Sequence, residues 1–445
     1  MTFASGPVPP IGGHSLFLFL LQVALLLLLA LLMGRLAARV SLPPIVGELL
    51  TGIVLGPSLL GNVAPDWFVW LFPPQTEQFH LLDAFGQIGV LLLVGMTGLS
   101  LDLKLIRKRG GTAAKVSLPG LVIPLALGVA AGFLVPQALL AENSHRTVFA
   151  VFLGIAMCVS AIPVIAKTLI DLKLLHRNVG QLILISGTVD DIFGWLGLSI
   201  VTAMATTGVQ AGGIARSVGF LALFLVVAFV IGRPLVRAAV RVTAKSAEFG
   251  PTISVAVVIV LLTSAISHLL GLEAVFGALV AGMLIRNAGH GVLERLTPLR
   301  TLVMTVLAPV FFAMAGLRMD LSALAQPTVL LAAVVLLLIA IVGKFAGAFL
   351  GAWASGLNRW EALAIGAGMN ARGVVEVVVA MVGLRLGVLS TEMYTIVVLI
   401  AIVTSLMSPP ILRMAAARIE VTAGERLRLS EYESPSRQQP AVDHA

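Results

Sequence analysis

Long runs of apolar residues recur along nearly the whole of the 445-residue chain. A helix that crosses the hydrocarbon layer of a bilayer needs about 20 apolar residues, and many of these runs exceed 18. Only 11% of the residues are charged, against about 25% in a typical soluble domain. A soluble globular protein and a disordered chain are therefore excluded. The runs are also too long for barrel strands, which alternate in short segments. We predict an all-α membrane protein.

Thirteen segments are predicted to cross the membrane. They lie at about 14–39, 43–61, 82–101, 112–136, 147–170, 178–205, 212–240, 250–270, 272–288, 301–319, 327–355, 361–385 and 390–413. The first is too long for a cleaved signal peptide, so we expect a retained helix. The expected parts are a short external N-terminus (1–13), a transmembrane domain (14–416) and a short disordered cytoplasmic tail (417–445). That tail is too short for a nucleotide-binding regulatory domain.

The distribution of positive charge predicts the orientation. With the N-terminus outside, 23 of the 29 Lys and Arg residues fall in inner loops or the tail and only 4 in outer loops. Such an excess of inner positive charge is the rule for multi-pass proteins. It also accounts for the net charge of +8 without a nucleic-acid partner. We expect a multi-pass protein of the cell (inner or plasma) membrane, with the N-terminus outside and the C-terminus inside.

Two of the predicted segments contain helix breakers. Pro163 lies within the fifth, and Gly366, Gly368 and Gly373 lie within the twelfth. Interrupted helices in corresponding halves of a transporter point to its binding site. The two segments are seven apart in order and so cross the membrane in opposite directions. This predicts an inverted repeat of segments 1–6 and 8–13. The alternative is two ordinary kinks, because Gly and Pro are common in membrane helices.

Asp190 and Asp191 lie in the middle of the sixth segment, with apolar residues on both sides. A charged residue at the bilayer centre costs about 2.5–3.5 kcal/mol, so such residues are candidates for function. Neighbouring side chains on a helix point about 100° apart, so the two carboxylates cannot serve one partner equally. Lys344, in the middle of the eleventh segment, is the natural partner for one of them. The alternative is a purely structural ion pair.

The twelfth segment carries Arg372 and Glu376 four residues apart, on one helix face. We expect a local salt bridge between them that braces the broken helix. Arg372, Glu376, Asn370 and Pro163 are thus predicted to stabilise the core of the site.

Buried carboxylates offer hard oxygen ligands, which suit a small cation that keeps part of its hydration. A proton and a cation then compete for one site, and exchange follows if that site opens alternately to each side. Unwound backbone can add carbonyl ligands, and Ser160 can add a hydroxyl. We therefore expect Asp191, Asp190 and Ser160 to bind the transported monovalent cation and the proton.

Other functions are less well supported by the sequence. It contains no His/Cys cluster with metal-ligand spacing and no phosphate-binding loop, so we expect no cofactor, no direct use of ATP and no enzyme activity. An intramembrane aspartyl protease needs its two aspartates on different helices. An organic-anion symporter is disfavoured by two adjacent carboxylates. A proton-independent cation channel or uniporter remains the alternative.

Several stretches occur in the order of a known family. They are Pro43-Pro44-Ile45-Val46-Gly47-Glu48 with Leu55-Gly56-Pro57-Ser58, Gly95-Met96 with Leu101-Asp102-Leu103, Asp190-Asp191, Phe311-Phe312 with Gly316-Leu317, Lys344, and Met369-Asn370-Ala371-Arg372-Gly373 with Glu376. Over about residues 40–380 the chain resembles the second branch of the monovalent cation/proton antiporters, whose membrane domain is sodium/hydrogen exchanger-like.

The resemblance implies a sodium/proton antiporter fold in which segments 5 and 12 are unwound and cross within a core that also includes segments 6 and 11. It implies that Asp191 is the obligatory ligand for the cation and the proton. Asp190 and Lys344 would form a coupling ion pair that breaks during the cycle. It also implies a homodimer and an elevator-like movement of the core. The transported ion, Na⁺ or K⁺, stays open.

Overall fold

The computed structural model describes residues 11–40, 42–100, 103–142, 144–207, 211–246, 248–289, 291–422 and 424–426. These residues are helical except for turns and one isolated bridge between Leu140 and Leu389, which confirms the all-α prediction. Within them, eleven helices are long and apolar enough to cross a membrane. The other two predicted segments correspond to shorter helices, described below. The number thirteen and the orientation remain predictions.

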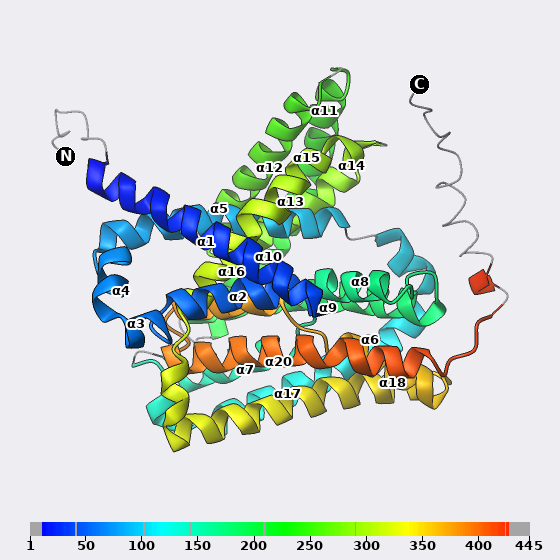
Figure 1. Cartoon of the computed structure of the whole chain (residues 1–445). Helices are drawn as coiled ribbons and strands as arrows, with labels where there is room; N and C mark the ends of the chain where they lie inside the picture. The colour runs from blue at the N-terminus through cyan, green and yellow to red at the C-terminus, as the bar shows by residue number, and fades with distance from the viewer. Residues whose placement is uncertain are drawn as a thin grey trace, which may run out of the picture. The chain divides into compact units, whose positions relative to one another are not determined.

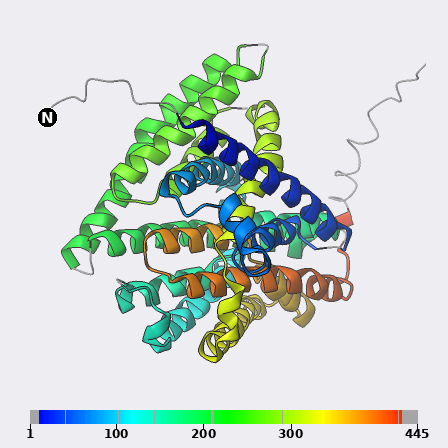
Figure 2. The same cartoon turned by 60° about the vertical axis from the view of Figure 1, so that its left-hand side comes forward.

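The chain divides into two compact units, Met1–Leu93 with Leu299–Leu321, and Val94–Pro298 with Ser322–Ala445. The boundaries at 13 and 416 predicted from the sequence concern the two ends of the membrane domain, and they stay predictions. The helices that lie wholly or mainly in the first unit are α1 (Gly13–Arg39), α2 (Pro44–Leu55), α3 (Leu60–Val63), α4 (Pro65–Leu71), α5 (Thr76–Ser100), α15 (Thr297–Leu302), the π-helical turn η3 (Val303–Leu307) and α16 (Ala308–Leu317). Both views show α1, in dark blue, as one unbroken helix (Figure 1, Figure 2).

Close packing of α2 on α16 organises the first unit. Gly52 and Gly316 lie where the two backbones meet, and a Cβ on either would overlap main-chain atoms of the other helix. Small residues at such contacts let membrane helices approach closely. Beside them, the Ser58 hydroxyl donates to the Met319 carbonyl at 2.9 Å. Arg318 forms an ion pair with Asp83 at 2.8 Å.

The second unit holds the remaining helices. They are α6 (Leu103–Leu134), η1 (Gln137–Leu139), α7 (Arg146–Cys158), α8 (Ile162–Asp171), α9 (Asn178–Thr207), α10 (Ala211–Val227), the π-helical turn η2 (Ala228–Gly232), α11 (Arg233–Thr243), α12 (Gly250–Leu269), α13 (Ala274–Arg286), α14 (Val292–Arg295), η4 (Leu321–Ala325), α17 (Pro327–Ala354), α18 (Arg359–Met369), α19 (Val374–Arg385) and α20 (Thr391–Ala416). The predicted segment 147–170 is thus split into α7 and α8, and 272–288 corresponds to α13.

A glycine stripe packs α17 against α6. Gly343, Gly347 and Gly351 recur every four residues and share one helix face. A Cβ on Gly347 would lie 2.5 Å from the carbonyl oxygen of Pro119 on α6. Lys344 follows the first glycine of the stripe, so this contact fixes its depth in the unit. The two helices run alongside α7 in Figure 1.

The beginning of the predicted disordered tail is packed against the second unit. Arg177, just before α9, donates to the carbonyl oxygens of Ile419 at 2.9 Å and Glu420 at 3.1 Å. The buried carboxylate of Glu425 pairs with Arg177 at 3.3 Å and accepts from the Asn178 amide at 2.7 Å. The sequence prediction did not foresee these contacts, because the partners of the segment lie more than 240 residues away in the chain. Residues 427–445 of the predicted tail lie outside the described residues.

Candidate functional site

The chain unwinds between α7 and α8. Val159 and Ala161 have extended backbone angles, and α8 begins at Ile162. Pro163 falls in the first turn of α8, where its missing amide hydrogen costs nothing because the first helical amides lack partners within the helix. The predicted break is therefore present, with the proline at its downstream edge. Ser160 lies in the unwound stretch and is fully buried.

A second unwound stretch, residues 370–373, separates α18 from α19. Gly373 has a φ of 158°, and a Cβ at this position would lie 2.7 Å from Cγ2 of Val164 on α8. A residue with a side chain would therefore be strained and would push α8 away. Gly366 and Gly368 were also predicted in the break, but α18 continues through them to Met369.

The two unwound stretches meet through the main chain. The amide of Ala161 donates to the carbonyl oxygen of Ala371 at 3.0 Å. The Ser160 hydroxyl lies 2.8 Å from the Met369 carbonyl and 3.0 Å from Oδ2 of Asp190, and its one proton is shared between these acceptors. Four half-helices thus end or begin around one point, where orphan amides and carbonyls meet in the protein interior.

Asp190 and Asp191 lie near the middle of α9, and both are fully buried. Oδ2 of Asp190 accepts from Lys344 and Ser160. Neither oxygen of Asp191 has a hydrogen-bond partner among the described residues. The two neighbours therefore have different surroundings, as their angular separation on the helix predicted. A buried carboxylate with no protein partner calls for an explanation, and a transported ion or proton provides one.

Lys344 is fully buried and has two acceptors. Its Nζ pairs with Oδ2 of Asp190 and donates to the carbonyl oxygen of Cys158. The Cys158 carbonyl is the last of α7 and has lost its helical donor. The predicted partnership between Lys344 and one aspartate is thus present, whereas the contact with the end of α7 was not foreseen.

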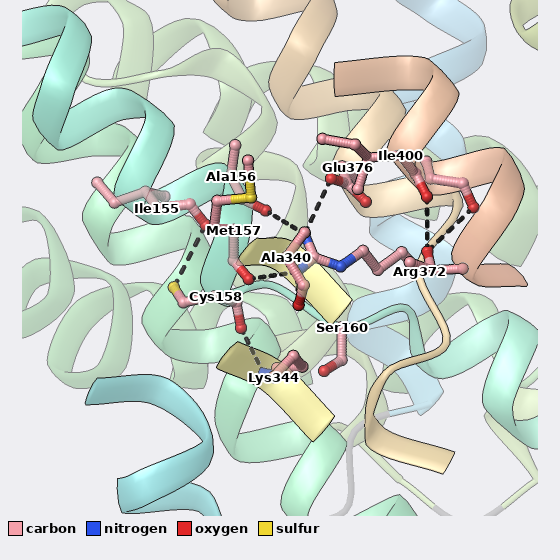
Figure 3. Close-up of polar contacts among 12 residues, drawn as sticks. Ile155, Ala156, Met157, Cys158, Ser160, Ala340, Lys344, Arg372, Glu376 and Ile400 are labelled. Atoms are coloured by element: carbon pink, nitrogen blue, oxygen red, sulfur yellow. Dashed lines mark hydrogen bonds and ion pairs between the residues drawn. The ribbon is translucent and has the colours of Figure 1, made fainter. Parts of the chain in front are cut away.

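Arg372 lies in the second unwound stretch and points toward the same helix end (Figure 3). It donates to the carbonyl oxygens of Ala156 at 3.0 Å and Met157 at 2.6 Å. It also pairs with Glu376 at 3.0 Å, which is the local bridge expected from the sequence. Cations are stabilised at helix C-termini and carboxylates in the first turn. The guanidinium of Arg372 therefore balances the partial negative charge at the C-terminal end of α7. The carboxylate of Glu376 balances the partial positive charge at the N-terminal end of α19.

Asn370 is buried beside these charges, and its side-chain amide has no hydrogen-bond partner among the described residues. Sequence reasoning assigned it to stabilising the core. Its unpartnered oxygen is equally a free ligand next to the unwound chain. Sequence reasoning also missed Ser405 and Ser408 of α20, which donate to Arg372 and Ala367. Two small polar residues in an apolar helix were the only signal for them.

Residues 24–417 match the family described as sodium/hydrogen exchanger, transmembrane. The chain belongs to this family. Among its relatives, the Na⁺/H⁺ antiporter NhaS4 of Synechocystis is 31% identical over 400 residues, which cover 89% of this chain and 97% of NhaS4. The K⁺/H⁺ antiporter 1 of Saccharomyces cerevisiae is 28% identical over 91% of this chain, which spans about half (47%) of that relative.

The fold of this family member also matches a solved structure. The sodium proton antiporter MjNhaP1 from Methanocaldococcus jannaschii superposes with a TM-score of 0.68 at 15% identity, and the match covers 91% of this chain and 99% of MjNhaP1. This likeness shows the antiporter fold. The family and its neighbours are transporters, and the long apolar helices show a multi-pass membrane protein.

Proposed function

We propose that the protein exchanges a monovalent cation, Na⁺ or K⁺, for protons across the membrane. The observation that carries this proposal is the carboxylate of Asp191, which is fully buried and has no hydrogen-bond partner on either oxygen within the described part of the chain. A buried charge without compensation is costly. Binding either a proton or a cation removes that cost, so the two ligands compete for one site. The relatives named as Na⁺/H⁺ and K⁺/H⁺ antiporters support the same activity.

Each residue around the site has a proposed role. Asp191 binds the cation or the proton, and the oxygens of Asp190, Ser160 and Asn370 are at hand as further ligands. Lys344 neutralises Asp190 while the site is empty, and a second positive charge entering the site would weaken that pair. Arg372 and Glu376 hold the half-helix ends in place. Exchange follows because the same site is loaded alternately from the two sides.

The test is a proton-flux assay in proteoliposomes with an entrapped pH probe. A pH gradient is imposed, and Na⁺, Li⁺ or K⁺ is then added. We expect at least one cation to collapse the gradient with the unmodified protein, which also identifies the ion. Asp191→Asn removes the titratable carboxylate at nearly constant volume and should abolish this response. Asp66→Asn, at an exposed position on α4, is the matched control and should leave it unchanged.

The alternative is a channel or uniporter on the same scaffold. It would carry cation current without moving protons against a gradient. If Asp191→Asn retains full exchange, the site assignment is wrong. If no monovalent cation moves protons, antiport is wrong, and cation conductance measured in the same vesicles becomes the deciding observation.

We further propose that the protein works as a homodimer in the cell (plasma) membrane. The family resemblance supports this, and the broad apolar surfaces of helices such as α1 and α12 suit contact with lipid or a second copy. Crosslinking in native membranes tests the dimer, and membrane fractionation tests the location.

A further inference from the structure

The carbonyl oxygens around the break between α18 and α19 are held from two directions. Those of Met369 and Ala371 accept from the other unwound stretch, through the Ser160 hydroxyl and the Ala161 amide. The carbonyl oxygens of Arg372 and Ala367 instead accept from α20. Hydrogen bonds from both directions therefore hold this stretch, and we refer to these bonds as the clamp.

Two serines of α20 form the second side of this clamp. Ser405 donates through Oγ to the Arg372 carbonyl, and Ser408 donates to the Ala367 carbonyl at 2.6 Å. Both are 1% exposed. A serine or threonine within a helix ordinarily bonds back to its own helix. Thr404 does so, donating to Ile400 at 2.8 Å. Ser405 and Ser408, three residues apart, share a face of α20. They donate outside their own helix, Ser405 to the unwound stretch and Ser408 to α18.

These two hydrogen bonds fix the orientation of the peptide groups between residues 367 and 372. An unpaired carbonyl in a dry interior is costly, so the Arg372 and Ala367 carbonyls keep to the serine hydroxyls. With the carbonyls at both ends of the stretch held in this way, the Met369 carbonyl faces the Ser160 hydroxyl and the Ala371 carbonyl faces the Ala161 amide. The side-chain amide of Asn370, between them, has no hydrogen-bond partner among the residues that the structure describes. The hydroxyls of α20 thus govern the shape of the chain next to the two aspartates.

We propose that Ser405 and Ser408 are positioning residues that set cation affinity and selectivity. They touch no ion and act by holding residues 369–373 in the geometry that the site uses. Cation selectivity depends on cavity size and on the rigidity of the ligands. Loosening this stretch should therefore alter which ion is preferred as well as how tightly it binds. The inference rests on the exchange activity proposed above and adds the residues that tune it.

The experiment compares neighbouring hydroxyls on one helix. Ser405→Ala and Ser408→Ala each remove one clamp bond, while Thr404→Val removes a hydroxyl that serves only its own helix. In proteoliposomes we expect each serine variant to raise the apparent KM for the cation by roughly three- to tenfold and to change the ratio of the Na⁺, Li⁺ and K⁺ responses. Thr404→Val should retain the wild-type KM and ratio. Ser405→Thr keeps the hydroxyl and should restore most of the affinity.

The outcomes separate this inference from the proposed function. Serine variants that melt earlier but keep the wild-type KM and ion ratio would show that the clamp only stabilises the fold, and the inference would be wrong. If Ser405→Ala yields no folded protein, Ser408→Ala decides by the same criterion. If the unmodified protein moves no protons in response to any cation, the exchange proposal itself fails.

Discussion

At the residue scale, the two adjacent aspartates separate into two roles. Asp190 is held by Lys344 and Ser160, whereas Asp191 has no hydrogen-bond partner among the residues described by the structure. Sequence reasoning anticipated this difference, because neighbouring positions on a helix face different surroundings and a buried lysine needs a carboxylate. It could not foresee that Lys344 also holds the last carbonyl of α7. That contact depends on how distant helices pack, which local pattern does not encode.

The pair of Lys344 and Asp190 should show strong energetic coupling. Lys344→Gln or Asp190→Asn alone leaves one buried charge uncompensated and should destabilise the protein by about 3–5 kcal/mol. The double variant removes both charges and should recover most of that loss. Unfolding in detergent measures all four proteins.

The same cycle at Arg318 and Asp83 is the control for this prediction. Both of their side chains are about one-third exposed (34% each). A partly solvated pair is worth little, so its coupling should stay below about 1 kcal/mol. Equal coupling at the two sites would mean that burial does not strengthen the Lys344 pair.

At the scale of the elements, the positions of proline and glycine predicted which helices are interrupted. They did not predict the residues at which the half-helices begin and end. Pro163 was placed inside a broken helix and instead lies in the first turn of α8. Gly366 was expected in the second break, yet it lies inside α18 facing Phe345 of α17. Glycine serves both unwinding and close packing, and the sequence alone does not distinguish the two. The contact of the tail with α9 was not predicted, since it joins residues far apart in the chain.

The contact of Glu425 with the start of α9 should depend on pH in a defined way. Burial acts to raise the pKa of this carboxyl, but the Asn178 and Thr422 amides and the Arg177 charge outweigh it, so the pKa lies below its ordinary value of 4.5. Because folding lowers this pKa, the contact has its full stability at pH values above 4.5. It loses stability only as the pH falls through the lowered pKa of the folded state. The protection of residues 417–422 against hydrogen exchange, taken relative to the intrinsic amide exchange rate at each pH, should therefore be the same at pH 8 and pH 6.

Glu425→Gln removes the charge and should lower that protection at both pH values. Glu392→Gln, at the start of α20, is the control and should leave it unchanged. Lower protection of the unmodified tail at pH 6 than at pH 8 would contradict the prediction, because it would mean that the carboxyl titrates near neutrality.

At the scale of the whole molecule, contacts join loops that the charge distribution assigns to the same side. Glu273 and Arg385, at the outer ends of the predicted segments 272–288 and 361–385, pair at 2.5 Å. Arg177 and Glu425, both predicted inside, pair at 3.3 Å. The sequence thus predicted the all-α fold class, while the orientation stays a prediction with which these two contacts agree. It did not predict the division into two units, which depends on contacts between distant helices.

This orientation can be tested with introduced cysteines, because the single native Cys158 is buried. Asp66→Cys, in a predicted outer loop, should react with a membrane-impermeant maleimide in intact cells. Lys245→Cys, in a predicted inner loop, should react only after permeabilisation. Both positions are exposed, so accessibility to the reagent does not depend on opening of the fold. The reverse pattern would invert the assigned orientation.

The bond from the Ala161 amide to the Ala371 carbonyl joins the two unwound stretches without any side chain. Main-chain atoms are common to all residues except that proline lacks the amide hydrogen. Evolution can therefore replace the side chains on either side of this junction while the junction itself persists. Distant relatives can keep one geometry and exchange nearly every residue around it, and selection for ion preference can act on the surroundings without dismantling the crossing.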